Sequence, residues 1–160
     1  AVTGVQTCAL PISRAGSIPS ITEIGQTEWP LTTTEMLAAM MDEAGVDKAT
    51  LVQAYFVYEY DNSYTIDSCL KHPQRFASVV VLDPMDPKSP DLLEEQVTKQ
   101  NVAGIRFMRG RLPESSLGKA ETFALWARIE KLKLPLSIND RVFEISKVVP
   151  VRSEEHTSEL

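Results

Sequence analysis

One stretch, residues 32–54, places a helix directly before a strand, and this arrangement restricts the fold more than any other feature. Thr32 and Glu35 have the spacing of a capping box, which predicts that a helix begins there. The apolar residues predicted to form the buried face of this helix are Met36, Leu37, Met40 and Ala44. Gly45 follows as a left-handed stop, and an apolar strand is predicted at 49–54. This succession is typical of α/β proteins with a parallel sheet.

The same succession recurs along the chain. Further helices are predicted at 62–71, 89–100 and 120–131, and further strands at 76–82, 102–108 and 135–138. The strand centres are about 25 to 31 residues apart, the length of a βα unit, and they are Leu51, Val80, Ile105 and Leu136. A long loop is predicted at 13–31, with Trp29 against the first helix, and another helix near residue 142. Four βα units fit either an open doubly wound sheet or half of an eight-stranded barrel.

The two ends of the chain differ from the rest because related DNA words can encode both. A single short nucleotide sequence can encode Val2 to Ile12. The reverse complement of most of that nucleotide sequence, apart from one base, can encode Arg152 to Leu160. The word resembles a short-read sequencing adapter. We therefore predict that residues 1–12 and 152–160 are non-native and lie outside the sheet with few buried apolar contacts. Residues 13–151 are then expected to form the only domain, cut at both ends.

Composition excludes several classes of partner. Without the two ends the chain has 15 Lys and Arg against 19 Asp and Glu, a net charge of −4 instead of −6. Mild acidity with no basic cluster argues against nucleic acid or an anionic membrane surface as a partner. No apolar run approaches the roughly 20 residues of a membrane helix. Cys69 is the cysteine that remains, which excludes an internal disulfide framework and predicts a reducing, cytoplasmic location.

Four segments resemble one family in their order and spacing. They are EMLAAMMDEAGVDKATLVQ, YDNSYTIDSCLKHPQRFASVVVLDP, VAGIRF and LWARIEKLKLPLSI. Their motifs AGVD-x-A-x-L-VQ, HP-x-RF with a later DP, and G-[IV]-R resemble the early barrel of the amidohydrolase-related family of metal-dependent hydrolases, which includes lactonases and decarboxylases. The resemblance implies a partial (β/α)8 barrel of the TIM type with about four parallel βα units, and it favours the barrel over the open sheet.

The resemblance also implies a chemistry. Most members hold one divalent metal that activates water, with a His-x-His pair on the first strand, later histidines and an Asp. None of these ligands is expected in residues 13–151, and the positions where some relatives carry a histidine read Asn139 and Asp140. Some members work without a metal. The full-length parent is therefore expected to use zinc or manganese, whereas this fragment is expected to bind no catalytic metal.

The implied parent hydrolyses a lactone, ester or amide, or decarboxylates a small carboxylate-bearing substrate, and a homo-oligomer fits the family. The fragment by itself is expected to be inactive. A half barrel would also leave its inward apolar side chains uncovered, namely Val79, Val81 and Met108. The competing hypothesis is a non-catalytic open α/β domain that binds a ligand or partner at its strand ends.

Polar residues at the carboxyl ends of the predicted strands are the candidates for substrate binding. Arg106 stands first, because alternation in GIRFMRG puts it on the face opposite Ile105 and Phe107. If that apolar pair faces the helices, Arg106 points into the barrel and needs a carboxylate from the protein or from a substrate. The other candidates are Gln53, Tyr55, Asp83, Arg109 and Asn139. No catalytic residue is assigned.

Several of these residues and their neighbours also have a purely structural interpretation. Asp83 with Pro84 is typical of a turn, and Arg109 of a solvated loop. Cys69 is predicted to be a small core residue, and His72 to end a helix where a cation suits the helix dipole. Four tyrosines cluster around Asp61-Asn62, and the simpler prediction is a cap at that pair with the tyrosines packing on the second helix, while the alternative is that they line a substrate mouth; they are Tyr55, Tyr58, Tyr60 and Tyr64.

Overall fold

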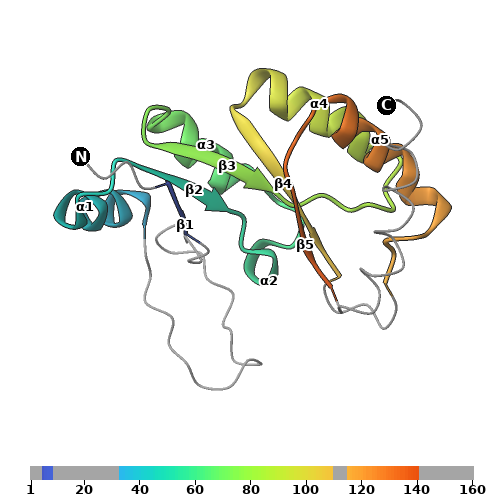
Figure 1. Ribbon diagram of the computed structural model, residues 1–160, viewed down its shortest axis with the longest axis horizontal. Helices are drawn as coiled ribbons and strands as arrows, with labels where there is room; N and C mark the ends of the chain where they lie inside the picture. Colours follow the sequence, from blue (N-terminus) through green and yellow to red (C-terminus); the bar gives the residue numbers. More distant parts are fainter. Residues whose placement is uncertain (1–4, 9–32, 110–114, 141–160) are drawn as a thin grey trace, which may run out of the picture.

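The computed structural model of the 160-residue chain describes residues 5–8, 33–109 and 115–140, which form one parallel sheet with helices along it (Figure 1). The strands are β1 (Val5–Cys8), β2 (Lys48–Val52), β3 (Phe76–Val80), β4 (Val102–Met108) and β5 (Leu136–Asn139). The helices are α1 (Thr34–Ala44), α2 (Tyr55–Tyr58), α3 (Ser63–Lys71), α4 (Ser89–Lys99), the 3-10 turn η1 (Ala120–Thr122) and α5 (Phe123–Lys131).

The strands pair in the order β1-β2-β3-β4-β5, and every pair is parallel. This order confirms the arc predicted for a barrel, because a doubly wound sheet would reverse direction after its first strands. The predicted helix and strand succession from residue 33 to residue 139 is also confirmed, except that β2 and β3 end at Val52 and Val80 and that the short helix α2, which begins at Tyr55, was not predicted. The molecule is therefore an α/β half-barrel of parallel βα units.

Strand β1 corrects one prediction. Residues 1–12 were expected outside the sheet, but Val5–Cys8 pairs in parallel with residues 48–51 of β2. The outer edge of β2 offers a row of backbone N–H and C=O groups, and an extended β-branched segment such as this one can pair with it. The non-native origin of the two ends stays a prediction. The loop at 13–31, Trp29, the helix near residue 142 and residues 152–160 lie outside the described residues.

Helix α1 begins and packs differently from the prediction. Its N-cap is Thr33, whose hydroxyl accepts a hydrogen bond from the Met36 N–H at 3.3 Å. The predicted cap, Thr32, lies outside the described residues. Thr34, Leu37 and Met41 are the buried residues of α1, so the predicted stripe was right only at Leu37: Met36 and Met40 are more than half exposed, and Ala44 is exposed as well. Gly45 ends the helix in the left-handed conformation at φ 68°, as predicted.

Arg75 explains why the segment HPQRF precedes β3. Its guanidinium donates to the carbonyls of Asp47 at 2.7 Å and Val46 at 3.1 Å, and it pairs with Asp42 at 2.8 Å. These bonds fasten the turn between α1 and β2 to the start of β3. The motif therefore has a structural role in aligning two neighbouring strands.

Two hydrophobic clusters lie on the helix-facing side of the sheet. One joins α1, α3, β2 and the start of β3, and it contains Cys69, which is confirmed as a small core residue. The other joins α3, α4 and α5 to β3 and β4. Its members include Val80, Leu93 and Ile105, each at most 2% exposed. Fully burying side chains of this size contributes about 1.5–3 kcal/mol each, so these clusters provide most of the stabilisation.

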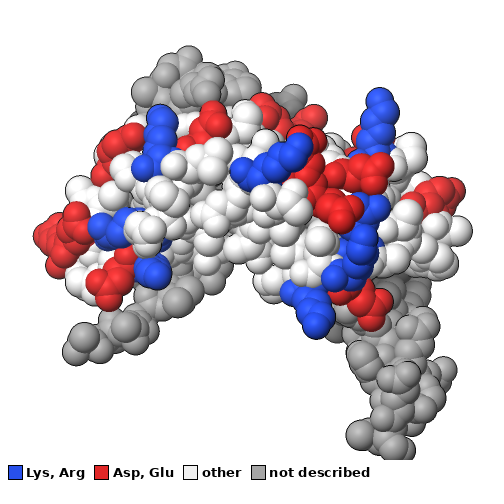
Figure 2. Space-filling view, turned by 90° about the horizontal axis from the view of Figure 1, so that it is seen from above, with Lys and Arg blue, Asp and Glu red and all other residues white. Residues whose placement is uncertain are grey.

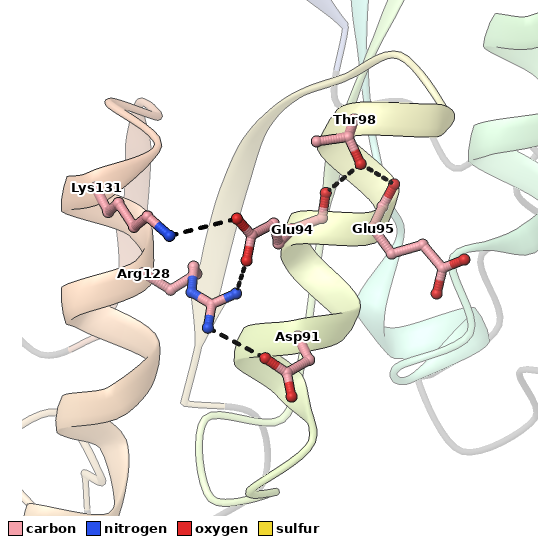
Figure 3. Close-up of polar contacts among 6 residues, drawn as sticks. All are labelled: Asp91, Glu94, Glu95, Thr98, Arg128 and Lys131. Carbon is pink, nitrogen blue, oxygen red and sulfur yellow. Dashed lines mark hydrogen bonds and ion pairs between the residues drawn. The ribbon is translucent and has the colours of Figure 1, made fainter.

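An ion-pair network adds to the packing of α4 against α5 (Figure 3). The Arg128 guanidinium lies between Asp91, at 3.1 Å, and Glu94, and Lys131 lies 3.5 Å from Glu94. Exposed pairs of this kind contribute about 0–1 kcal/mol each. The network therefore fixes how the two helices sit beside each other more than it stabilises the fold.

The inward side of the sheet is less open than predicted. Val79 is half-buried, but Val81 is fully buried and Met108 is 5% exposed, so the expected exposure of these two side chains was wrong. The segment after β2 lies against Val81, because the Asn62 side chain hydrogen-bonds both the C=O and the N–H of Val81. On β5 the exposed inward residues are Ser137 and Asn139.

Candidate functional site

A bulge in β4 decides which way Arg106 points. Ser78 pairs with Val102 but Val79 pairs with Gly104, so Ala103 is an extra residue in β4. Gly104 passes so close to its neighbours that an added Cβ would lie 3.2 Å from the Pro135 carbonyl. After this bulge the side chains alternate regularly again. Ile105 joins the helix-side core, which confirms the predicted alternation and leaves Arg106 on the inward face.

Arg106 has no acidic partner among residues 5–8, 33–109 and 115–140. It is half-buried, and its Nε atom is buried without a hydrogen-bond partner. In register it lies opposite the exposed Ser137 of β5. The structural ion pair considered from the sequence is therefore not found in this part of the chain. A buried guanidinium N–H without an acceptor costs about 1–3 kcal/mol or more, so the position favours a carboxylate ligand.

Arg109, at the end of β4, has a different environment. Its Nε lies 3.4 Å from Oδ1 of Asp140, whose side chain is fully buried, and its backbone N–H donates to the Asn139 carbonyl at 3.2 Å. The Ser115 hydroxyl donates to the other oxygen of Asp140. The prediction of a solvated Arg109 was wrong, because this buried carboxylate at the end of β5 attracts it. Arg109 thus belongs to a polar cluster that links the ends of β4 and β5.

Asp83 and the tyrosines lie beyond the ends of β2 and β3. Asp83 Oδ1 accepts from the Met85 N–H at 2.9 Å, and its carbonyl accepts from the Ser89 hydroxyl at 2.6 Å, so the turn predicted there is confirmed. The rings of Tyr55 and Tyr60 pack edge to face, with their centroids 5.3 Å apart. Burial raises the pKa of Tyr60, and a hydrogen bond with Tyr55 and the charge of Asp83 raise it further. Tyr60 therefore stays a neutral phenol across the physiological range.

Gln53 and Asn62 brace the segment that carries these tyrosines. Gln53 is 1% exposed, and its Nε2 donates to the carbonyls of Glu59 at 2.8 Å and Asp61 at 3.2 Å. Asn62 donates to the Val81 carbonyl and accepts from the Val81 N–H, both at 2.8 Å. Asn62 is the N-cap residue of α3 without a capping side-chain hydrogen bond, and the Asp61 carboxylate next to it accepts from the Ser63 N–H, so the cap predicted at Asp61-Asn62 is made by Asp61. The Asn62 amide replaces a neighbouring strand for the residue that follows β3.

The structure thus brings the predicted residues to one edge of the sheet, but in separate groups. Arg106 and Asn139 lie on the neighbouring strands β4 and β5, and Arg109 follows them, whereas Gln53, Tyr55 and Asp83 follow β2 and β3. Sequence reasoning assigned no role to Ser115 or to the carboxylate of Asp140. The adjacency of Asn139 and Asp140 after a strand was a usable signal, because a buried acid there needs a partner.

Several other functions lack support in the described residues. In that part of the chain no three His, Cys, Asp or Glu side chains gather closely enough to hold a metal ion, so these residues do not fit a catalytic metal. No helix there is long and apolar enough to cross a membrane. On the face seen in Figure 2, acidic and basic side chains are interspersed, and the coloured basic ones form no continuous stripe. A hollow of about 200 Å³ lies elsewhere, between α1 and α3.

An arc of parallel strands with its candidate groups at the strands' carboxyl ends defines a barrel of the TIM type, in which active sites occupy that edge. Residues 27–149 match the family model of the amidohydrolases, and the chain belongs to this family. No curated protein sequence matches it. The family and the fold inferred from the sequence motifs are both confirmed.

Solved structures of similar fold include three enzymes. The first is a probable 2-pyrone-4,6-dicarboxylic acid hydrolase from Acinetobacter baumannii with citric acid bound, with a TM-score of 0.69, 16% identity, and coverage of 94% of this chain and 54% of that one. The second is 5-carboxyvanillate decarboxylase from Novosphingobium aromaticivorans with manganese and 4-hydroxy-3-methoxy-5-nitrobenzoic acid. It has a TM-score of 0.64, 18% identity, and coverage of 85% of this chain and 49% of that one. The third is 2,6-dihydroxybenzoate decarboxylase from Rhizobium, with a TM-score of 0.64, 17% identity, and coverage of 87% of this chain and 50% of that one. This chain spans about half the length of each.

Proposed function

We propose that this chain is part of an enzyme that hydrolyses or decarboxylates a small carboxylate-bearing substrate, and that Arg106 binds the substrate carboxylate. The observation that carries the proposal is the inward-facing guanidinium whose Nε is buried without a partner, on the strand edge where barrel enzymes hold their substrates. The carboxylates in the solved relatives, citric acid and a nitrobenzoic acid, are the kind of ligand that would satisfy it. A planar guanidinium suits a carboxylate because it can donate two parallel hydrogen bonds.

Tyr60 and Asp83 would form the opposite wall of the site. The Tyr60 phenol is already hydrogen-bonded with Tyr55, so it would face a substrate oxygen as a member of that pair. Gln53 and Asn62 would hold that wall in place through the backbone bonds described above. Tyr55 would contact the substrate through the ring that packs on Tyr60, and Asn139 through its exposed amide on β5.

We further propose that the whole protein uses a divalent metal, zinc or manganese, held by ligands other than the described residues. Manganese in the related decarboxylase supports this proposal. When bound, such an ion supplies an activated water or polarises the substrate. The 160-residue chain alone is then expected to show no turnover of a lactone or of a hydroxybenzoate, and to bind no equivalent of metal after dialysis. The protein would act in the cytoplasm on a small molecule rather than on nucleic acid or a membrane, and a homo-oligomer fits the family.

A titration of the chain with benzoate, followed by ¹H–¹⁵N NMR, tests the proposed role of Arg106. Wild type is expected to bind in the millimolar range, with shifts concentrated at the ends of β4 and β5. Arg106→Gln is expected to weaken binding at least tenfold, because a charged hydrogen bond is worth about 1.5–3 kcal/mol. Arg128→Gln is the matched control, since Arg128 lies between α4 and α5. Equal benzoate binding by Arg106→Gln and wild type would refute the assignment. If the whole protein binds a ligand or a partner but turns over no substrate, the non-catalytic alternative is favoured.

A further inference from the structure

The two arginines near the end of β4 differ in how their charge is compensated. Arg109 has Asp140 at 3.4 Å from its Nε, and the Asp140 side chain is fully buried. Arg106 pairs with no acidic side chain of the described ranges. The edge formed by β4 and β5 therefore carries one compensated and one uncompensated cation.

Asp140 is held firmly at this position. One of its oxygens faces Arg109, and the other accepts a hydrogen bond from the Ser115 hydroxyl. The chain around it is fixed as well, since the Arg109 N–H donates to the Asn139 carbonyl and the Leu117 N–H donates to the Ser115 hydroxyl. A buried carboxylate held on both oxygens keeps a fixed position beside Arg109.

We infer that Asp140 is a specificity residue that sets how many carboxylates a substrate can present to this edge. The inference rests on the proposed function and deepens it. Because Asp140 offsets the positive charge of Arg109, a second substrate carboxylate gains little there and is repelled by Asp140 itself. The site thus prefers a substrate with one carboxylate, bound by Arg106, over one with two.

Geometry makes a two-carboxylate ligand a fair comparison. Arg106 and Arg109 are three residues apart, so at a strand rise of about 3.3 Å per residue their Cα atoms are roughly 10 Å apart. Arg109 lies one residue beyond the end of β4, at the same carboxyl edge as Arg106, so the second carboxylate of an aromatic ring can report on the charge at this edge. Benzoate and isophthalate are therefore matched probes, since they share the ring and differ by one carboxylate.

The test compares the dissociation constants of the two probes for the 160-residue chain by ¹H–¹⁵N NMR titration. Wild type is expected to bind them equally within about twofold. Asp140→Asn is expected to shift the ratio about fivefold toward isophthalate, because it removes a negative charge in contact with Arg109. The double variant Asp140→Asn with Arg109→Gln is expected to return to the wild-type ratio. Ser115→Ala removes one hydrogen bond but no charge, and it is expected to leave the ratio unchanged.

Arg109→Gln alone provides a test that does not depend on Asp140→Asn being folded. It leaves the Asp140 carboxylate without its cation, so it is expected to shift the ratio several-fold away from isophthalate, and a ratio within twofold of wild type would overturn the inference. An unchanged ratio in folded Asp140→Asn would also overturn it. These outcomes differ from failure of the proposed function, which is loss of benzoate binding in wild type or its persistence in Arg106→Gln.

Discussion

Neighbouring residues of β4 serve opposite sides of the sheet. Ile105 is 2% exposed and packs among Val80, Leu93 and Leu125 on the helix-facing side. Arg106 faces inward, opposite the exposed Ser137, with a guanidinium nitrogen that no described residue satisfies. The comparison teaches that stability and binding are divided between the two faces. The helix-facing side is closely packed with apolar side chains, whereas the inward side carries a buried guanidinium N–H without a hydrogen-bond acceptor.

The largest expected effect comes from emptying the helix-facing side. Ile105→Ala should lower the free energy of unfolding by about 3 kcal/mol, because it removes buried methylene and methyl groups and leaves a cavity. Ser137→Ala, on the inward side of the neighbouring strand, should change it by less than about 0.5 kcal/mol. Urea denaturation followed by circular dichroism measures both. Comparable losses in the two variants would contradict the division between the faces.

A smaller loss is expected where the carboxyl edge depends on a side chain for its backbone bonds. Asn62→Ala should cost about 2–3 kcal/mol, since it leaves the buried N–H and C=O of Val81 without partners. Asn139→Ala removes the same group from an exposed position and should be nearly neutral. The same denaturation experiment applies. A neutral Asn62→Ala would mean that water or another group replaces the amide.

Alkaline pH probes how well the helix-facing side excludes water. Burial raises the pKa of the Cys69 thiol to about 12, above its ordinary value of 9.0. A raised pKa in the folded state gives a contribution that is complete below about pH 9 and is lost as pH rises toward 12, at about 1 kcal/mol per pH unit. The wild type should therefore lose stability faster than Cys69→Ala between pH 9 and 10.5. Parallel profiles for the two proteins would show that the thiolate reaches water easily.

The smallest expected effect has the opposite sign. Arg106→Met should leave the free energy of unfolding unchanged or raise it by up to about 1 kcal/mol, because a partly buried charge without a partner is replaced by an apolar group of similar length. Thermal unfolding in low salt, followed by circular dichroism, measures the change. A loss of more than about 1 kcal/mol would show that Arg106 has a structural partner and would weaken its assignment to substrate.

Local sequence patterns carried most of the fold. Each strand from β2 to β5 is a short apolar run that follows a helix, and Gly45 correctly marked the end of α1. The helix predicted from residue 89 begins there, although Lys88 is its N-cap residue. The buried stripe of α1 was harder, since Met36 with Met40 and Leu37 with Met41 have the same helical spacing. The choice between them depends on a partner distant in sequence, because Thr34 bonds the Ser68 hydroxyl at 2.7 Å. Strand β1 was missed because its pairing depends on the edge of β2.

The site was predicted where alternation alone determines direction and missed where contacts are distant. The inward direction of Arg106 followed from the residues on either side of it. The Arg109–Asp140 pair joins residues 31 positions apart, and the Asn62–Val81 bonds join residues 19 apart, so neither leaves a periodic pattern in the sequence. Charge compensation between strands can therefore be recognised only after the strands are placed side by side.

The extra residue at Ala103 has a consequence for how this strand can change. Val102 and Ile105 both face the helix-side core although they are three residues apart, because the bulge at Ala103 absorbs the odd spacing. Deleting Ala103 would make the pairing regular and leave Ile105 opposite Val80 and Arg106 on the inward face. A relative without this residue would thus keep the same functional surface, whereas a substitution that keeps the residue but draws it into regular pairing would exchange the two faces of β4 beyond it.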